Sequence, residues 1–221
     1  MDFSPLILTF KLAAITTVLL LIVGIPLSYW LAFSKFRFKF IFEALVSMPL
    51  VLPPSVLGFY LLIAFSPNNF LGNFLDKYFN LRLVFSFEGL ILSSFIFSLP
   101  FMVHPIISGF KSIPINIQEA AYTLGKSKFT TLKKVLLPNI KPALLSGIVL
   151  SFAHTIGEFG VVLMIGGNIP NQTRVASIAI YDEVEALNYS TANKYAFILF
   201  IISFTILIAV HYFNKKMIKP F

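Results

Sequence analysis

Residues 119–142, "EAAYTLGKSKFTTLKKVLLPNIKP", decide how this chain is organised. The stretch carries five lysines, one glycine and two prolines, and it separates two long apolar runs. Its apolar residues nevertheless recur at the spacing of an amphipathic helix. A basic, helical interruption between two apolar runs predicts a segment that lies outside the membrane and connects two membrane-spanning helices.

The composition agrees with a membrane protein. The 221 residues are 57% hydrophobic and only 12% charged, with a mean hydropathy of +0.88, whereas soluble domains carry about a quarter charged residues. Several apolar runs exceed the roughly 20 residues that cross a bilayer, and they lack the alternation of a membrane β-barrel. The sequence therefore predicts an all-α integral membrane protein of one domain, residues 1–221, whose 26 phenylalanines largely face lipid.

Five runs are long and apolar enough to cross a membrane: 8–33, 41–65, 87–110, 143–165 and 195–213. The first ten residues contain one acidic and no basic residue. That start differs from the basic one of a cleavable signal peptide, so the first run is expected to remain as a span.

The distribution of basic residues predicts the orientation. Twelve of the seventeen lysines and arginines lie in 34–40, in 111–141 and in the tail after Phe213, which carries Lys215, Lys216 and Lys219. Loops rich in lysine and arginine stay in the cytoplasm. The N-terminus is then outside, the C-terminus is cytoplasmic, and the outer loops are 66–86 and 166–194. Because this bias explains the net charge of +8, no nucleic-acid partner is expected.

Two short elements are expected outside the spans. Within the second outer loop, "VASIAIYDEVEAL" (175–187) has the spacing of a short helix at the outer surface. On the other side, 116–137 predicts two amphipathic helices joined at Gly125, a residue that tolerates the backbone of a helix end. Asn116 is predicted to cap the first helix, with Glu119 completing a capping box.

The two predicted helices of 116–137 each have an apolar stripe. The stripes consist of Ile117, Ala120, Ala121 and Leu124 in the first helix and of Phe129, Leu132, Val135 and Leu136 in the second. Pro138 is expected to end the second helix, and Pro142 suits the first turn of the next span. Three surfaces remain possible for the stripes: the chain's own spans, anionic lipid, or a groove on a partner protein.

The spacing of Glu119-Ala120-Ala121, Gly125 and Pro138 resembles the "EAA" loop of ABC importer permeases. The resemblance implies a MetI-like permease fold, in which this loop docks on a separate cytoplasmic ATPase that uses ATP and Mg²⁺. The coupling residues that it implies are Glu119, Ala120, Ala121, Leu124, Gly125, Leu132, Leu136 and Pro138.

Three further stretches, "MPLVLPPSVLGFYLL" (48–62), "FSLPFMVHPI" (97–106) and "HTIGEFGVVLMIGGNIPNQTRVASIAIYDEVE" (154–185), look like the molybdate/tungstate permease family. This resemblance implies a homodimer in a bacterial or archaeal cytoplasmic membrane that receives molybdate or tungstate from an extracytoplasmic binding protein. The GEFG stretch is also similar to sulfate permeases, so sulfate or another oxyanion is the alternative cargo. Related permeases often have arginine where this chain has His154.

His154 and Glu158 are the main ionisable candidates within a span. They lie four residues apart, so a continuous helix would place both on one face. A lone charge near mid-span costs about 2.5–3.5 kcal/mol on insertion scales. Two interpretations stay open: a structural pair, or residues on a translocation path or its gate. Gly157 and Gly160 serve close helix packing or a flexible gate.

Prolines interrupt two of the predicted spans, at Pro49, Pro53 and Pro54 and at Pro100 and Pro105. Broken helices are tolerated where a cavity or a packed neighbour satisfies the freed backbone groups, so kinks and a substrate path are equally compatible. Along such a path, the hydroxyls of Ser55, Ser98 and Thr155 would contact an oxyanion transiently, because a pathway must also release its ion. His104 is expected to be packed or interfacial.

Signatures of catalysis are missing from the sequence. It has no P-loop, no HExxH and no GxSxG motif. Cysteine is absent, and the three histidines lack metal-ligand spacing. We therefore expect no catalytic residue, cofactor or metal in this chain. A membrane-embedded enzyme or a channel is the remaining alternative, for which only His154 and Glu158 come near to a catalytic pair.

Overall fold

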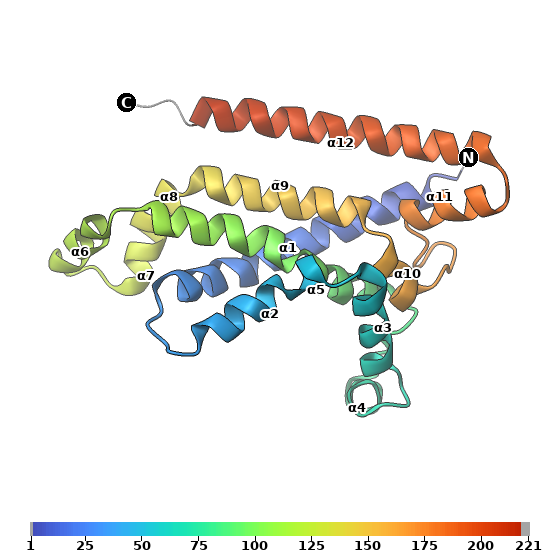
Figure 1. Cartoon of the computed structure of the whole chain (residues 1–221), viewed down its shortest axis with the longest axis horizontal. Coiled ribbons are helices and arrows are strands. Elements are labelled where there is room, and N and C mark those ends of the chain that lie inside the picture. The colour runs from blue at the N-terminus through green and yellow to red at the C-terminus, as the bar shows by residue number, and fades with distance from the viewer. Residues whose placement is uncertain (1, 218–221) are drawn as a thin grey trace.

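The computed structural model describes residues 2–217, except the side chains of 210, 211 and 213–217. In this range the regular structure is helical, as predicted. Four long helices run along the long axis of the molecule (Figure 1): α1 (Ser4–Phe33), α5 (Phe87–Ser112), α9 (Lys141–Gly157) and α12 (Tyr189–Met217). Three helices are long and apolar enough to span a membrane, and up to five spans result if two bent pairs, 39–51 with 54–65 and 128–139 with 141–157, each count as one.

The core of the bundle is formed by α1, α5 and α9. Leu12 of α1 and Leu90 of α5 share one buried apolar cluster, and Leu20 and Met102 share another further along the same two helices. Gly24 makes close approach possible, because a Cβ there would lie 2.8 Å from the Met102 side chain. The predicted first and third spans are thus confirmed with nearly the expected bounds.

The last helix, α12, is attached more loosely. It lies along one edge of the bundle (Figure 1), and the smallest share of its residues is buried among the three uninterrupted spans. Near its start, the Tyr195 hydroxyl donates to the Asp2 carbonyl at 2.6 Å. Helix α12 begins at Tyr189, six residues before the predicted start at 195, so the observed helix is longer than the predicted span. Lys219 and the side chains of Lys215 and Lys216 lie outside the described residues.

The second predicted span, 41–65, is not one helix. It consists of α2 (Lys39–Val51) and α3 (Pro54–Phe65), which are bent by 114°. Leu52 and Pro53 are extended, with ψ of 135° and 134°. Each of them precedes a proline, and a proline pushes the residue before it out of the helical region. Two consecutive prolines therefore break the span, and α3 leaves the bundle sideways (Figure 1).

The fourth predicted span, 143–165, is also broken. Helix α9 ends at Gly157, and α10 (Gly160–Gly166) begins after an interruption at Glu158 and Phe159. Glu158 is extended, with ψ of 132°. The prediction that a continuous helix carries His154 and Glu158 on one face is therefore wrong.

The lysine-rich segment contains α6 (Ile115–Thr123), α7 (Lys128–Thr131), the π-helix η1 (Leu132–Leu136) and α8 (Leu137–Asn139). Gly125 has φ of +71°, a backbone conformation that favours glycine. The Gly125 N–H donates to Tyr122 O at 2.9 Å and the Lys126 N–H to Ala121 O at 3.1 Å. This Schellman pattern closes α6 and confirms the predicted break at Gly125.

Two details of that segment differ from expectation. Helix α6 begins at Ile115, directly after Pro114, so Asn116 lies inside the helix and no side chain caps it. The predicted capping box of Asn116 and Glu119 is therefore wrong. Pro138 does not end the second helix, because a π turn, with the Leu137 N–H bonded to Leu132 O, accommodates the residue that lacks a donor.

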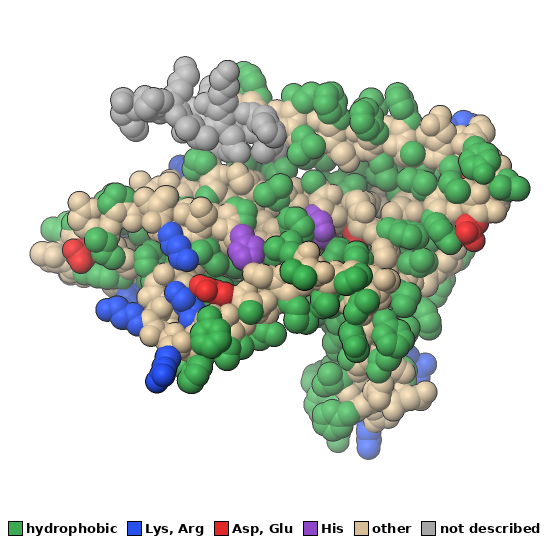
Figure 2. All heavy atoms as spheres, viewed as in Figure 1, with side chains coloured by type: hydrophobic (Ala, Val, Ile, Leu, Met, Phe, Trp, Pro, Cys, Tyr) green, Lys and Arg blue, Asp and Glu red, His purple; other side chains and the backbone are tan. Residues whose placement is uncertain are grey.

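The remaining connections are partly helical. In 66–86 an unpredicted helix, α4 (Phe70–Phe79), ends at Asn80 in the left-handed conformation. In 166–194 the predicted short helix is present as α11 (Ala176–Glu185). Figure 2 shows that most of the Lys and Arg side chains on its face gather at the end of the bundle near α2 and α7, with others at α4. The start of α1 and the end of α12 lie at opposite ends of the bundle (Figure 1).

Candidate functional site

The two broken spans meet at their breaks. Helix α3 packs against α10. A Cβ at Gly160 would lie 2.9 Å from the Pro54 Cβ and 3.3 Å from the Ser55 nitrogen. A Cβ at Gly58 would lie 3.1 Å from the Val161 Cα. Both glycines therefore allow the two helices to approach more closely than larger residues would permit.

A cleft of about 650 Å³ opens beside this contact. It is lined by Pro54, Ser55, Phe97, Ala153, His154, Gly157, Glu158, Phe159 and Gly160. Five of the seven residues that the sequence suggested for a pathway are in this set: Ser55, His154, Gly157, Glu158 and Gly160. The other two, Ser98 and Thr155, are buried behind His154. The lining contains neither lysine nor arginine.

A chain of hydroxyl groups holds the imidazole of His154. The Thr155 hydroxyl donates to Ser151 O at 2.9 Å. Ser98 Oγ lies 3.0 Å from Thr155 Oγ1 and 2.9 Å from His154 Nδ1. Because the Thr155 proton is already used, the Ser98 hydroxyl donates to Thr155 and accepts from Nδ1–H. A neutral His154 therefore keeps Nε2 as an acceptor, and only a doubly protonated ring can donate from Nε2.

Aromatic rings fix the same imidazole from its faces. The ring of His154 stacks on Phe101 with centroids 3.9 Å apart, and Phe97 lies 4.7 Å away. Hydrogen bonding and stacking together leave this side chain a single well-defined position at the wall of the cleft.

Glu158 has a different environment. The residue is 4% exposed, and neither carboxyl oxygen has a hydrogen-bond partner among the described residues. The Ser94 hydroxyl is also buried without a hydrogen-bond partner among the described residues. The Glu158 carbonyl accepts from Ser177 Oγ at 2.6 Å, which ties the break to α11. The hypothesis of a structural pair with His154 is therefore wrong in this conformation, since the imidazole is bonded to Ser98.

The lysine-rich segment presents an exposed apolar tip. Leu124 is 76% exposed, Ile115 and Ile117 are also exposed, and Ala121 is the only one of the four predicted first-stripe residues that is buried. The other end is anchored, because Leu136 is fully buried in the cluster that contains Leu20 and Met102. The part of the segment around Leu124, its tip, is thus uncovered. The part around Leu136, its root, is packed into the bundle.

The other coupling residues lie along the same segment. Glu119 and Ala120 are exposed on α6, and the Glu119 carbonyl accepts from Thr123 Oγ1 at 3.0 Å. Leu132 is half-buried against the core, and Pro138 lies within α8. The sequence pattern therefore located an exposed surface, but it did not indicate which end would be buried.

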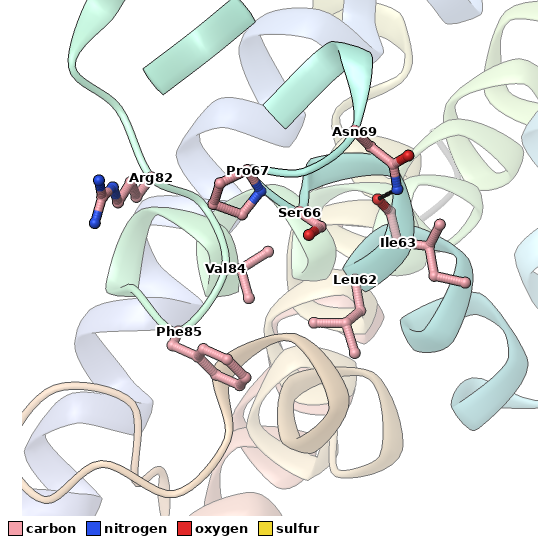
Figure 3. Close-up of a pocket in the computed structure, with 8 residues that line it drawn as sticks. All are labelled: Leu62, Ile63, Ser66, Pro67, Asn69, Arg82, Val84 and Phe85. Carbon is pink, nitrogen blue, oxygen red and sulfur yellow. Dashed lines mark hydrogen bonds between the residues drawn. The ribbon is translucent and has the colours of Figure 1, made fainter. Parts of the chain in front are cut away.

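A second cavity of about 480 Å³ lies at the far end of α3 (Figure 3). It is lined by Leu62, Ile63, Ser66, Pro67, Asn69, Arg82, Val84 and Phe85. Arg82 points away from the other residues (Figure 3), and its Nε lies 3.0 Å from Asp76 Oδ2. The Asp76 carboxylate raises the pKa of Arg82. Since the guanidinium is already paired and points outward, this cavity is a poor site for an anion.

These features together define a class: a helical, multi-pass membrane protein in which two broken spans border a cleft and an amphipathic segment is exposed at one end. A family model described as "Binding-protein-dependent transport system inner membrane component" matches residues 24–219, and the chain belongs to this family. It is thus an inner-membrane subunit of an ABC transporter and not its ATPase. The alternative of a membrane-embedded enzyme or a channel is excluded.

Two relatives illustrate the similarity. "Molybdenum transport system permease protein ModB" of Azotobacter vinelandii is 44% identical over 211 residues, which cover 95% of this chain and 93% of that protein. "Probable sulfate transport system permease protein cysT" of Nephroselmis olivacea is 31% identical over 213 residues, which cover 96% of this chain and 75% of that protein.

A solved structure shows the same fold. It is titled "Inward facing conformations of the MetNI methionine ABC transporter", and it aligns with a TM-score of 0.74 at 16% identity over 97% of this chain and 95% of that chain. The predicted MetI-like permease fold is therefore confirmed. Membership in a binding-protein-dependent system also implies two kinds of partner, a cytoplasmic ATPase and a periplasmic binding protein.

The hydrogen bonds around His154 lead to a prediction about its tautomer. In the neutral state the proton is expected on Nδ1, because Ser98 can only accept there. ¹⁵N-histidine NMR of the transporter in bilayers distinguishes the two tautomers, and a His154→Gln variant assigns the signal. The Ser98→Ala variant is expected to lose the preference for Nδ1–H. A wild-type neutral ring protonated on Nε2 would contradict this arrangement.

Proposed function

We propose that this chain is the permease subunit of an ABC importer that carries molybdate or tungstate across the cytoplasmic membrane. The observation that carries the proposal is the 44% identity to a molybdenum permease over nearly the full length of both proteins. The sulfate relative is less similar, and this chain covers only 75% of its length. Sulfate import is the second candidate, because the GEFG stretch fits it as well.

We infer a route for the anion along the cleft between the broken spans. Ser55 lies in the first turn of α3, where backbone N–H groups lack intrahelical partners and the helix dipole is positive. Half-helix N-termini receive anionic groups in this way in other transporters. Glu158 also lines the cleft, and an acidic side chain there would repel an anion, which favours a structural or gating role over anion binding. With no lysine or arginine in the lining, the site would bind weakly enough to release its ion.

The other predicted pathway residues support this route indirectly. Ser98 and Thr155 would act as positioning residues that hold His154 at the wall of the cleft. Gly157 has open space around it, since a Cβ there would meet nothing within 4 Å. Gly160 is closely packed on Pro54. In a gate at this break, Gly157 would therefore be the mobile glycine and Gly160 the fixed one.

A homodimer is expected to complete the pathway. One copy borders the cleft from α3, α5, α9 and α10, and the α3–α4 arm extends away from the bundle (Figure 1). Figure 2 shows histidine side chains on one face of the molecule, over α5 and α9. Two copies with these faces together would enclose the route. An extracytoplasmic binding protein would deliver the anion to the outer opening.

The exposed tip of the lysine-rich segment is the proposed docking site for the ATPase. Leu124 and Ile115 present apolar surface that the described residues leave uncovered. ATP and Mg²⁺ would be bound by the ATPase and not by this subunit. Force on the tip would reach the bundle through Leu136, and movement of α9 would then change the cleft at its other end.

Molybdenum accumulation tests the proposed cargo. Cells that lack this protein are expected to lose most high-affinity molybdenum uptake at low external molybdate, and the intact chain should restore it. An equal concentration of tungstate is expected to compete strongly, whereas an equal concentration of sulfate should have little effect. Accumulation that is unchanged by the deletion, or that sulfate suppresses as well as tungstate does, would remove the molybdate assignment.

The Leu124→Asp variant tests the docking surface. A charge on this exposed apolar tip should reduce recovery of the ATPase with the permease, and transport-coupled ATP hydrolysis, by at least about tenfold. Because Leu124 is exposed, the variant should still fold. Leu187→Asp is the matched control, since Leu187 is 73% exposed but follows α11 at the opposite end. Normal recovery of the ATPase with Leu124→Asp would refute the docking assignment.

A further inference from the structure

An apolar groove lies between α1 and the lysine-rich segment. It has a volume of about 560 Å³ and is lined by Leu21, Ile22, Ile25, Pro26, Phe129, Leu132, Lys133 and Leu137. Seven of these eight residues are apolar, and Lys133 is the only charged one. The groove shares no lining residue with the cleft at Ser55 and His154.

The groove lies in the corner between the spanning helix α1 and the helical residues 128–139 of the lysine-rich segment. Residues 128–139 are bent by 79° relative to α9, which runs along the bundle, so this segment lies roughly along the end face of the spans. Leu136 points from the segment into the core and is fully buried. Phe129 and Leu137 are left to line the corner against α1.

The apolar walls of this corner are uncovered in the described chain. Ile22 is 64% exposed and Phe129 is 73% exposed. Ile22 precedes the end of α1 at Phe33 by eleven residues, which is about 16 Å along a helix. Helix α1 has 30 residues, about 45 Å, so it is longer than a hydrocarbon core of about 30 Å, and the groove lies along its second half. The wall formed by Ile22 and Ile25 is the side of a spanning helix, which faces acyl chains, whereas a cytoplasmic ATPase docks at the end of the bundle.

The positive charge of Lys133 at the rim of the groove indicates which lipid headgroup would fit there. Five lysines lie within 126–141, and none of them takes part in the ion pairs found among the described residues, which join Lys39 to Glu43, Arg82 to Asp76 and Arg174 to Asp182. Lys133 is exposed at the rim formed by the lysine-rich segment. An apolar groove with an unpaired cation at its inner rim is complementary to a lipid with an anionic headgroup.

We propose that this groove binds one anionic phospholipid of the inner leaflet, with an acyl chain against Ile22 and Phe129 and the phosphate at Lys133. The lipid would brace the root of the segment against α1. The inference uses the predicted orientation and does not depend on which oxyanion is carried. Its test is a binding measurement without substrate, so its failure is distinct from failure of the transport assignment.

Native mass spectrometry of the delipidated transporter tests the site with phosphatidylglycerol and phosphatidylcholine as probes. The wild type is expected to bind one phosphatidylglycerol per permease chain at least about fivefold more tightly than phosphatidylcholine, because one lysine near an anionic lipid contributes about that factor. Lys133→Gln should remove this preference. Lys134→Gln is the matched control, since Lys134 is adjacent and exposed but does not line the groove, and it should keep the preference.

The Ile22→Trp variant tests the acyl-chain part of the site. A bulkier side chain at this exposed position fills the groove and should abolish the bound lipid while Lys133 remains. Equal binding of the two lipids to the wild type, or equal effects of Lys133→Gln and Lys134→Gln, would overturn the proposal. Lipid binding that survives Ile22→Trp would overturn it too. Absence of lipid in the wild type, with loss of the dimer in Ile22→Trp, would assign the groove to a second copy.

Discussion

The arrangement depends on the rule that a membrane leaves no backbone polar group without a partner, so a helix can break there only against protein or a polar cavity. This chain breaks two spans, at Leu52–Pro53 and at Glu158–Phe159, and the breaks meet. Val56 and Leu57 donate their N–H groups to Pro53 O, and Ser177 donates to Glu158 O. The first turn of α3 thus satisfies the Pro53 carbonyl and α11 satisfies the Glu158 carbonyl, so each break has a protein partner beside the cleft.

The same geometry connects the cleft to the exposed segment. Helix α9 has 17 residues, about 25 Å of rigid rod, and runs from the root of the lysine-rich segment to Gly157 at the cleft. At one end Leu136 and Ile140 are packed in the core. At the other end the chain leaves the helix at Glu158 without a proline. In the proposed mechanism, a displacement of the residues around Leu136 would be transmitted along α9 to the wall of the cleft that carries His154.

Much of this was predictable from residues 119–142 and the apolar runs, because span length and lysine distribution are local properties. The break at Pro53 had a strong local signal in its two prolines, whereas the one at Glu158–Phe159 had only the flanking Gly157 and Gly160, which fit close helix packing as well. Asn116 was predicted to cap α6, but the helix already begins at Ile115, directly after Pro114. Ser55 and His154 were each suspected from sequence. Both residues line one cleft because α3 packs against α10. The sequence of each span, taken alone, does not show which helices pack together.

The most direct test of the central claim measures water access to the cleft in different nucleotide states. The chain has no cysteine, so Ser55→Cys gives it a single reactive thiol. In membranes with the complete transporter, a membrane-impermeant thiol reagent should label Ser55→Cys from one side without nucleotide and from the opposite side with a non-hydrolysable ATP analogue. Labelling from the same side in both states, or in neither, would contradict an alternating cleft between the broken spans.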